Sequence, residues 1–204
     1  MTRTRVARLK IAALISAITA CSCGSAAAPE APLAAVVNVE FRQSLIGPTK
    51  FGGAAWDGPG QLDASAEGEL RMALHAVDSY AGVLRVFANP AIEALEKPEP
   101  FGRARSVVNG VIIQNLDLKT AQRDTLTPIW QNARLIRVPL TPATRIELEL
   151  YDKDVINDDA IGAATITYAD LVTALRAGTI HHVRVAEQTN NQLLFVDISV
   201  EAAP

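Results

Sequence analysis

The sequence predicts an all-β fold, an eight-stranded antiparallel β-sandwich with a helical insertion, and three observations support this prediction. Eight segments of strand character follow one another at short spacing, separated by turns and loops rich in glycine, proline and aspartate. The clearest segment, residues 145–151, alternates apolar and polar side chains, which is typical of a strand with one buried face. Between the first and second strands the apolar period changes from two to three and four, which predicts helices.

The expected strands share short length and β-branched or alternating composition. They cover residues 36–46, 102–108, 111–122, 132–140, 145–151, 162–168, 180–186 and 192–201. Asn109-Gly110 predicts a two-residue hairpin turn between the second and third strands, because both residue types tolerate positive φ. A short helix over residues 169–176, ended by Gly178, interrupts the later strands. The short, regular spacing favours antiparallel pairing throughout.

The loop after the first strand contains the helical insertion, residues 65–97. Apolar residues recur at helical spacing up to about Ala88, which predicts one amphipathic helix. Leu70, Met72 and Leu74 also alternate, so a short strand remains an alternative there. A proline two residues after Ala88 then starts a second short helix in its first turn. The insertion would cover the loops, offer an apolar surface to a membrane, or form a groove for a partner.

Four carboxylates lie within eight residues directly after the strand 145–151: Asp152, Asp154, Asp158 and Asp159. Like charges this close repel one another, so water must solvate them or a cation must neutralise them. Because carboxylates offer only oxygen ligands, the cation that suits such a flexible loop is Ca²⁺. A calcium loop and a solvated acidic hairpin are therefore equal alternatives on these residues alone.

The first twenty residues have the features of a secretory signal peptide. Its basic start carries Arg3, Arg5, Arg8 and Lys10, and residues 11–20 form an apolar stretch too short to span a bilayer. The stretch ends in Ile18-Thr-Ala-Cys21, which resembles the lipobox of bacterial lipoproteins. That resemblance implies cleavage before Cys21, acylation of Cys21 and anchoring to a bacterial membrane in the cell envelope. An ordinary secretory signal is the alternative.

Residues 21–35 are rich in Ala, Pro, Ser and Gly, which predicts a flexible tether between the anchor and a domain over residues 36–204. The charge of the chain beyond the signal peptide restricts its partners. Removing four cations from the 19 Lys and Arg residues leaves 15 against 22 Asp and Glu, a net charge of −7. An acidic domain of this kind lacks the basic field that nucleic acid requires, so we expect no nucleic-acid partner.

Three motifs, in this order along the chain, resemble those of C2 domains. Pro98-Glu-Pro-Phe101 is similar to the family's Ser-Asp-Pro-Tyr at the end of the first calcium-binding loop. The segment from Thr125 to Trp130, Thr-Leu-Thr-Pro-Ile-Trp, is similar to the family's Thr-Leu-Asn-Pro-Val-Trp. The stretch from Asp152 to Gly162 resembles the third calcium-binding loop. Together the motifs extend the resemblance over roughly residues 36–201.

The resemblance implies an eight-stranded C2-like β-sandwich in the circularly permuted, type II strand order, with loops at one end that bind Ca²⁺ and often contact phospholipid. Carried over residue by residue, it implies a set of metal ligands: Asp57 and Glu99 in the first loop, and Asp152, Asp154 and Asp159 in the third, with Asp158 as an alternative to Asp159.

The sequence departs from the family pattern in three ways. Glu99 stands where the family has aspartate, and its longer side chain shifts the carboxylate outward. The gap between Asp154 and Asp159 is one residue shorter than usual. The first loop carries an insertion of about thirty residues. These departures leave the retention of calcium binding open.

The function that the resemblance implies is that of a membrane-anchored binding module, which takes up Ca²⁺ and bridges to a phospholipid headgroup or another acidic ligand. The alternative is a calcium-independent structural lipoprotein that binds an envelope protein through the inserted helices and sheet faces. Because the sequence shows no nucleophile paired with a base, no enzyme activity is expected.

Two pairs of residues invite a functional reading that the sequence does not favour. His181 and His182 are adjacent on a strand, so their side chains point to opposite faces and do not suit one metal ion. Trp56 and Trp130 are expected to be packing anchors of the sandwich rather than lipid probes.

Overall fold

The computed structural model describes residues 34–57, 60–154, 157–186 and 190–204, which lie within one compact unit, Leu33–Pro204. The predicted signal peptide and Cys21 lie outside the described residues. The strands of the described part are β1 (Val36–Ile46), β2 (Pro100–Val108), β3 (Val111–Lys119), β4 (Arg134–Pro139), β5 (Thr144–Asp152), β6 (Asp159–Thr167), β7 (His181–Arg184) and β8 (Leu193–Ala202). Its helices are α1 (Ala64–His75), α2 (Tyr80–Phe87), α3 (Pro90–Glu93) and α4 (Tyr168–Ala177).

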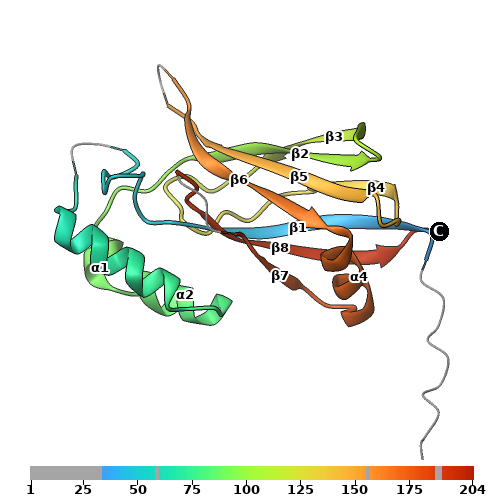
Figure 1. Ribbon diagram of the computed structural model, residues 1–204. Helices are drawn as coiled ribbons and strands as arrows, with labels where there is room; N and C mark the ends of the chain where they lie inside the picture. Colours follow the sequence, from blue (N-terminus) through green and yellow to red (C-terminus); the bar gives the residue numbers. More distant parts are fainter. Residues whose placement is uncertain (1–33, 58–59, 155–156, 187–189) are drawn as a thin grey trace, which may run out of the picture. The chain divides into compact units, whose positions relative to one another are not determined.

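The eight strands form two four-stranded antiparallel sheets, in the orders β4-β1-β8-β7 and β3-β2-β5-β6 (Figure 1). This confirms the predicted β-sandwich. The first strand leads directly into the loop that carries the insertion, and the last strand, β8, pairs beside β1, as expected for the permuted order. The observed strands lie close to the predicted ones, although β6 begins at Asp159, three residues earlier than expected.

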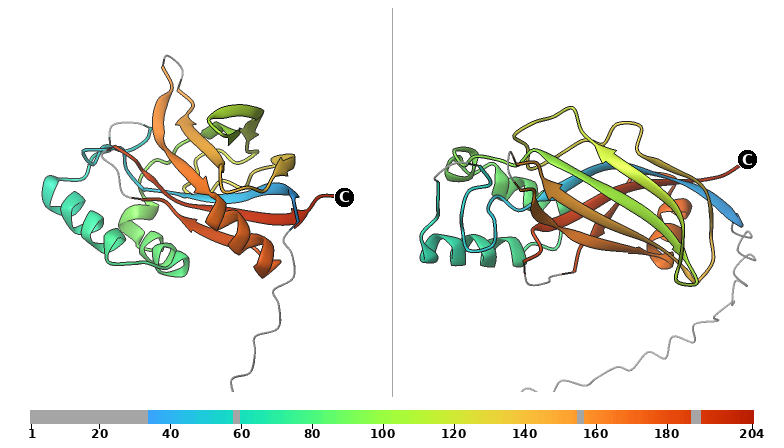
Figure 2. Two further views of the ribbon diagram at one scale, coloured as in Figure 1. Left: turned by 45° about the vertical axis from the view of Figure 1, so that its right-hand side comes forward. Right: turned by 90° about the horizontal axis from the view of Figure 1, so that it is seen from above.

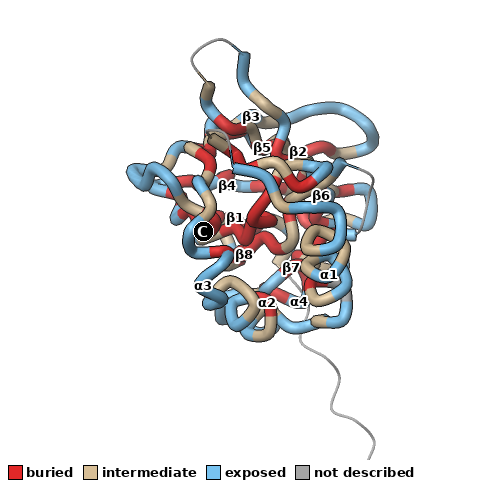
Figure 3. Tube along the Cα trace, turned by 90° about the vertical axis from the view of Figure 1, so that its left-hand side faces the viewer, coloured by how far each residue is buried: buried red, intermediate tan, exposed pale blue. Residues whose placement is uncertain are grey.

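The core lies between the two sheets and is built from the inward side chains of alternating strands. In β5, Ile146, Leu148 and Leu150 are buried while the residues between them are only partly so, which confirms the predicted alternation. In β1, Val39 and Phe41 are buried against them in the same core cluster. Figure 3 shows the buried segments gathered on the inner strands and the exposed ones on loops and outer helix faces.

The β2–β3 hairpin has the turn that the sequence predicts. Asn109 and Gly110 connect the paired residues Val108 and Val111, and both turn residues have positive φ, 51° and 79°. This combination matches the right-handed twist of the strands. In the middle of β2, Gly102 packs so closely on β5 that an added Cβ would lie 2.2 Å from the carbonyl oxygen of Glu149.

The insertion differs from the prediction of one long helix followed by a second one. The chain forms two helices, α1 and α2, because a second helix start occurs at Ser79, whose side chain accepts a hydrogen bond from the backbone N–H of Gly82. The alternative of a short strand over residues 70–74 is wrong, since these residues lie within α1. The following helix α3 begins at Pro90 as predicted but ends at Glu93, short of Lys97.

The inserted helices pack on the outer face of the β4-β1-β8-β7 sheet. Figures 1 and 2 show α1 and α2 beside this sheet. Leu45 of β1 and Phe195 of β8 are buried against Leu74 of α1 and Val83 of α2, in a cluster separate from the central core. The ring of Tyr80 stacks on His182 of β7, with centroids 4.1 Å apart. The insertion is therefore joined to the sandwich by an apolar cluster of its own. No helix of the described residues is long and apolar enough to cross a membrane.

Candidate calcium site

The loops at one end of the sandwich bring three of the predicted carboxylates together. Asp57 follows β1 in the first loop, whereas Asp152 and Asp154 lie at and just beyond the end of β5. One carboxylate oxygen from each lies within 4.8 Å of the other two. Oxygens this close, on side chains of like charge, have the chemistry of a hard-cation site.

Asp152 is the buried centre of this group, with no exposed side-chain surface. Its Oδ1 accepts a hydrogen bond from the backbone N–H of Glu99 at 2.7 Å, which follows from the pairing of Asp152 with Pro100 at the start of β2. Its Oδ2 is also buried, and it has no hydrogen-bond partner among the described residues. Burying a carboxylate oxygen without a hydrogen-bond donor costs free energy, and a bound cation would compensate for that cost.

Burial raises the pKa of Asp152 to about 6, the backbone hydrogen bond from Glu99 opposes that rise, and the charges of Asp57 and Asp154 add to it. Burial also raises the pKa of Asp57, and the charge of Asp154 acts in the same direction. The shifts show that the three carboxylates repel one another in a partly desolvated position. A bound cation would favour the charged carboxylates and so lower these pKa values.

The other three predicted ligands lie in the same loops but contact protein groups. Glu99 pairs with Arg123, whose Nε lies 3.6 Å from Glu99 Oε1. Asp158 accepts a hydrogen bond from the backbone N–H of Asp154 at 3.3 Å. Asp159 Oδ2 lies 2.5 Å from Lys50 Nζ. The structure thus brings three of the six predicted ligands together and places Glu99, Asp158 and Asp159 around them.

Lys50 is a member of the site that the sequence analysis missed. It follows β1 in a loop without a recognisable motif, and only the fold brings it to the acidic loops. Burial lowers its pKa, but the hydrogen bond with Asp159 and the charges of Asp159, Asp154 and Asp152 raise it overall. Its ammonium also lies 5.9 Å from the ring centroid of Trp56. Lys50 therefore supplies one tethered positive charge to the cluster.

Both tryptophans are packing anchors, as predicted. Trp56 is 2% exposed and donates its indole N–H to the carbonyl oxygen of Gly47 at 2.9 Å. Trp130 is 4% exposed and donates to Ser44 Oγ at 3.0 Å. Trp56 immediately precedes Asp57, so the buried indole fixes the segment that carries this carboxylate.

A cavity of about 1100 Å³ lies beside the acidic cluster, between the loops and the edge of the β3-β2-β5-β6 sheet. Glu99, Asp154 and Asp158 line it on the loop side. The basic side chains of Lys119, Arg123 and Lys153 line it as well. An acidic group entering this cavity would meet both a bound cation and these basic side chains.

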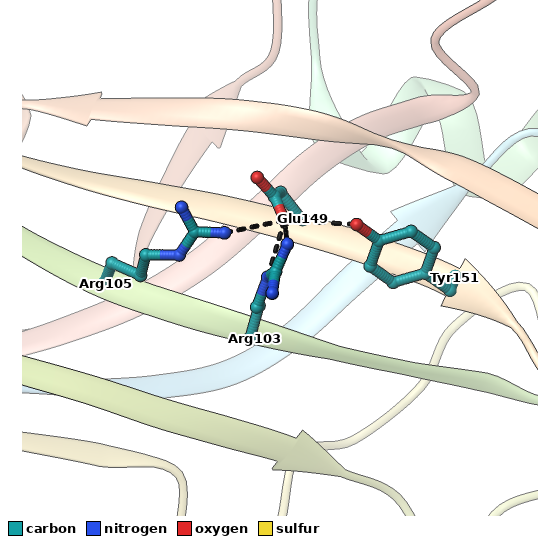
Figure 4. Close-up of polar contacts among 4 residues, drawn as sticks. All are labelled: Arg103, Arg105, Glu149 and Tyr151. Carbon is teal, nitrogen blue, oxygen red and sulfur yellow. Dashed lines mark hydrogen bonds and ion pairs between the residues drawn. The ribbon is translucent and has the colours of Figure 1, made fainter.

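Further along the same sheet, the outward side chains of β2 and β5 neutralise one another (Figure 4). Glu149 Oε2 accepts hydrogen bonds from Arg103 Nε at 2.6 Å, Arg105 Nη2 at 3.0 Å and Tyr151 Oη at 3.1 Å. Partial burial acts to raise the pKa of Glu149, but the hydrogen bonds from Arg103 and Tyr151 and the two guanidinium charges lower it overall. These arginines are therefore engaged by the protein itself.

The two histidines contact different carboxylates. His181 Nε2 lies 3.8 Å from Asp170 Oδ1 on α4. His182 Nδ1 lies 2.7 Å from Asp197 Oδ1 on β8. Each imidazole is thus oriented by a carboxylate of its own.

A two-sheet antiparallel sandwich with carboxylates gathered in the loops at one end resembles a C2 domain. The family model of the C2 domain matches residues 89–183, which contain β2 to β6, α4 and the third acidic loop. This match confirms the resemblance to C2 domains that the motifs predict. No curated protein matches the chain.

Solved structures of C2 domains and of a phospholipase are similar to the chain at low identity. The first of these, a C2 domain of plant extended synaptotagmin 1, is 11% identical, with 85% of this chain and 98% of that chain covered and a TM-score of 0.44. The calcium-bound pair of C2 domains of extended synaptotagmin 2 is 15% identical, with 83% and 46% covered and a TM-score of 0.43. Human GIVD cytosolic phospholipase A2 is 14% identical, with 84% and 17% covered and a TM-score of 0.43. The chain thus spans less than half of the last two structures.

Proposed function

We propose that this protein is a C2-like binding module that takes up Ca²⁺ at Asp57, Asp152 and Asp154. The observation that carries the proposal is the buried Oδ2 of Asp152, which has no donor among the described residues and lies beside two further carboxylates. Ca²⁺ takes six to eight oxygen ligands in flexible geometry, and three carboxylates supply only part of such a shell. Asp158, Glu99, water or an oxygen of a ligand would complete it.

The second part of the proposal is that the bound ion bridges to an acidic group, such as a phospholipid headgroup. Its support is the cavity beside the cluster, which Lys119, Arg123 and Lys153 line together with the carboxylates. An acidic group in that position gains from the basic side chains but is repelled by the unfilled cluster. Calcium would remove this repulsion, so we expect the binding of acidic ligands to depend on calcium.

The third part concerns location. The lipobox-like Ile18-Thr-Ala-Cys21 supports an exported protein that is lipid-anchored through Cys21 to a bacterial membrane. Calcium sites of extracellular modules have dissociation constants of roughly 10⁻⁴–10⁻³ M. In the cell envelope such a site would act as a structural or bridging site rather than as a transient sensor. Intact-mass spectrometry of the protein from its membrane fraction tests the acylation of Cys21.

The test of calcium binding uses residues 25–204, which include the whole compact unit Leu33–Pro204. Thermal unfolding is recorded in EDTA, in about 5 mM Ca²⁺ and in about 5 mM Mg²⁺, above the range of extracellular calcium sites. At this concentration, about five to fifty times such a dissociation constant, a ligand adds roughly 1.1–2.3 kcal/mol to the free energy of unfolding, or several degrees in Tm.

Two variants make this test specific. The Asp152→Asn/Asp154→Asn variant should lose the calcium shift, whereas Asp78→Asn, at an exposed residue between α1 and α2, should retain it. Mg²⁺ should give a much smaller shift than Ca²⁺. An equal response of the double variant, or no response of the unmodified protein, contradicts the calcium site. Co-sedimentation with phosphatidylglycerol vesicles, with and without Ca²⁺, then tests the bridge to an acidic headgroup.

A calcium-independent interaction protein remains the second candidate, and one observation favours it. Lys50 already places an ammonium beside the acidic cluster, 2.5 Å from Asp159 Oδ2, so the protein carries part of the neutralising charge itself. In that case Tm is unchanged by Ca²⁺ and by Mg²⁺. The insertion on the outer face of the β4-β1-β8-β7 sheet is then the first surface to test for a protein partner.

A further inference from the structure

A second cavity, of about 430 Å³, lies between α1 and the sandwich. The β1–α1 loop, α1, the end of β7 and residues 190–192 surround it. Leu70 and Leu74 of α1 and Leu194 of β8 give it an apolar wall. Its other lining includes the cationic side chains of Arg71 and Arg184. It shares none of the three clustered carboxylates of the candidate calcium site.

Arg184 lines this cavity, and its guanidinium includes a nitrogen without a hydrogen-bond acceptor among the described residues. Its Nη2 donates to the carbonyl oxygen of Leu74 at 3.3 Å, and its guanidinium carbon lies 4.9 Å from the ring centroid of Phe195. Its Nη1 is buried and has no hydrogen-bond partner among the described residues. Within the same part of the chain, no carboxylate lies at ion-pair distance from this guanidinium.

The other cations around the cavity differ from Arg184, because each already has a carboxylate partner. Arg71 Nη2 lies 2.6 Å from Glu67 Oε1 on the same helix, and its guanidinium carbon lies 5.4 Å from the ring centroid of Phe51. Lys50 pairs with Asp159. A buried guanidinium nitrogen without an acceptor is costly, and charge-assisted hydrogen bonds to carboxylate or phosphate oxygens are the strong way to satisfy it.

We infer that this cavity binds a small amphipathic anion, a carboxylate or phosphate on a short apolar chain, with the Arg184 guanidinium donating to an anionic oxygen. The apolar wall formed by α1 and Leu194 accommodates the chain, and the cavity falls within the usual size of small-molecule sites, about 300–1,000 Å³. Asn190 and Gln192 add polar side chains at the rim. The helical insertion would thus have created a ligand site that the sandwich alone lacks.

The experiment is isothermal titration calorimetry of residues 25–204 in EDTA, so that its outcome does not depend on calcium binding. The probes are octyl phosphate, octanoate, inorganic phosphate and, as a neutral reference, 1-octanol. We expect octyl phosphate or octanoate to bind at one site per molecule and 1-octanol to bind at least tenfold more weakly, because it cannot accept a charge-assisted hydrogen bond. Inorganic phosphate binding as tightly as octyl phosphate would identify a free phosphate as the ligand, whereas tighter binding of the octyl compounds would identify a lipid-type anion.

Two variants probe the cavity from different sides. Arg184→Gln should weaken binding at least tenfold, and Leu70→Trp should abolish it by filling the cavity while leaving the guanidinium in place. Arg85→Gln removes the same charge from an exposed position on α2 and should change nothing. Thermal unfolding of each variant, followed by circular dichroism, establishes that it is folded.

Three results would overturn the inference. They are the absence of binding by every anion, equal binding of 1-octanol and octyl phosphate, and unchanged anion affinity in folded Arg184→Gln and Leu70→Trp variants. Because all of these measurements are made in EDTA, they do not depend on calcium binding. The calcium site and the anion site are therefore tested independently.

Discussion

Lys50 and Asp159 form an ion pair at the edge of the acidic cluster, with Nζ 2.5 Å from Oδ2. Lys50 lies in the loop that follows β1, and Asp159 is the first residue of β6. The ion pair therefore connects the first and third loops. The lysine side chain is 27% exposed and the aspartate side chain 49%, so water screens the interaction in part. The tethered ammonium both stabilises the acidic cluster and opposes the entry of a cation.

Removing this ammonium should strengthen calcium binding. In Lys50→Met, Asp159 loses its partner and the negative potential at Asp152 and Asp154 increases. Because an exposed ion pair of this kind contributes about 0.2–1 kcal/mol, we expect the calcium dissociation constant to fall by a factor of roughly 1.4 to 5. Calorimetric titration with Ca²⁺ measures the change. Lys97→Met, at a lysine whose ammonium donates to the backbone carbonyl oxygen of Glu93 in α3, is the matched control. An unchanged or weakened affinity would show that Lys50 does not oppose the ion.

The stability of the calcium-free protein should fall as pH rises between about 4 and 6. The pKa of Asp152 is raised to about 6 in the folded state, above its ordinary value of 3.8, so the folded state binds the proton more tightly than the unfolded state does. The free energy of unfolding therefore decreases through this window, and the full cost, roughly 2–3 kcal/mol, is present above pH 6.

Asp152→Asn removes that titration and should raise the free energy of unfolding at pH 7 in EDTA, although it also removes a calcium ligand. Urea unfolding at several pH values between 4 and 7.5, with and without Asp152→Asn, measures both effects. In excess Ca²⁺, the free energy of unfolding of the unmodified protein should decrease much less over this pH range. Parallel pH profiles for the two proteins would contradict the assignment to Asp152.

Calcium should change the fluorescence of Trp56 but leave that of Trp130 nearly constant. The indole of Trp56 lies beside Asp57 in the chain and 5.9 Å from the Lys50 ammonium, so a new cation alters its electrostatic surroundings. Trp130 contacts Ser44, away from these charges. Tryptophan emission is measured during titration with Ca²⁺. The response should persist in Trp130→Phe and disappear in Trp56→Phe, and the reverse result would place the ion elsewhere.

Two glycines should respond in opposite directions to an added methyl group. In Gly102→Ala, the new Cβ would lie 2.2 Å from the carbonyl oxygen of Glu149 and 2.6 Å from Leu150 Cδ2, so we expect a loss of about 1–3 kcal/mol. In Gly68→Ala, within α1, nothing lies within 4 Å, and we expect a gain of about 0.5–1 kcal/mol. Denaturant unfolding of both variants gives the free energies. Equal effects would argue against the close contact of β2 with β5.

The sequence predicted those features that depend on local patterns. The alternation of residues 145–151 gave the buried face of β5, and Asn109-Gly110 gave the β2–β3 turn. Asp152 and Asp154 were identified as site residues because they follow that strand directly. The family resemblance added Asp57, which is distant in sequence and joins them in space.

The remaining features depend on contacts between distant segments. The break between α1 and α2 escaped prediction because apolar spacing continues across Ser79, while the cap that restarts the helix is a single hydroxyl. Lys50 has no motif, and its role arises only when the end of β1 meets the start of β6. Arg184 likewise acquires a half-buried position because the Leu74 carbonyl of α1 lies against it. Periodicity does not carry such information.

The direction of β1 determines where the acidic loops lie relative to the start of the domain. Val37 pairs with Ala202 at the end where the chain enters the sandwich, and Ile46 lies at the other end, beside the acidic loops (Figure 1). A strand of 11 residues spans roughly 35 Å at about 3.3 Å per residue. The acidic loops and the point where the chain enters the domain therefore lie about one strand length apart, so a partner bound at these loops meets the domain at the end opposite its N-terminal entry.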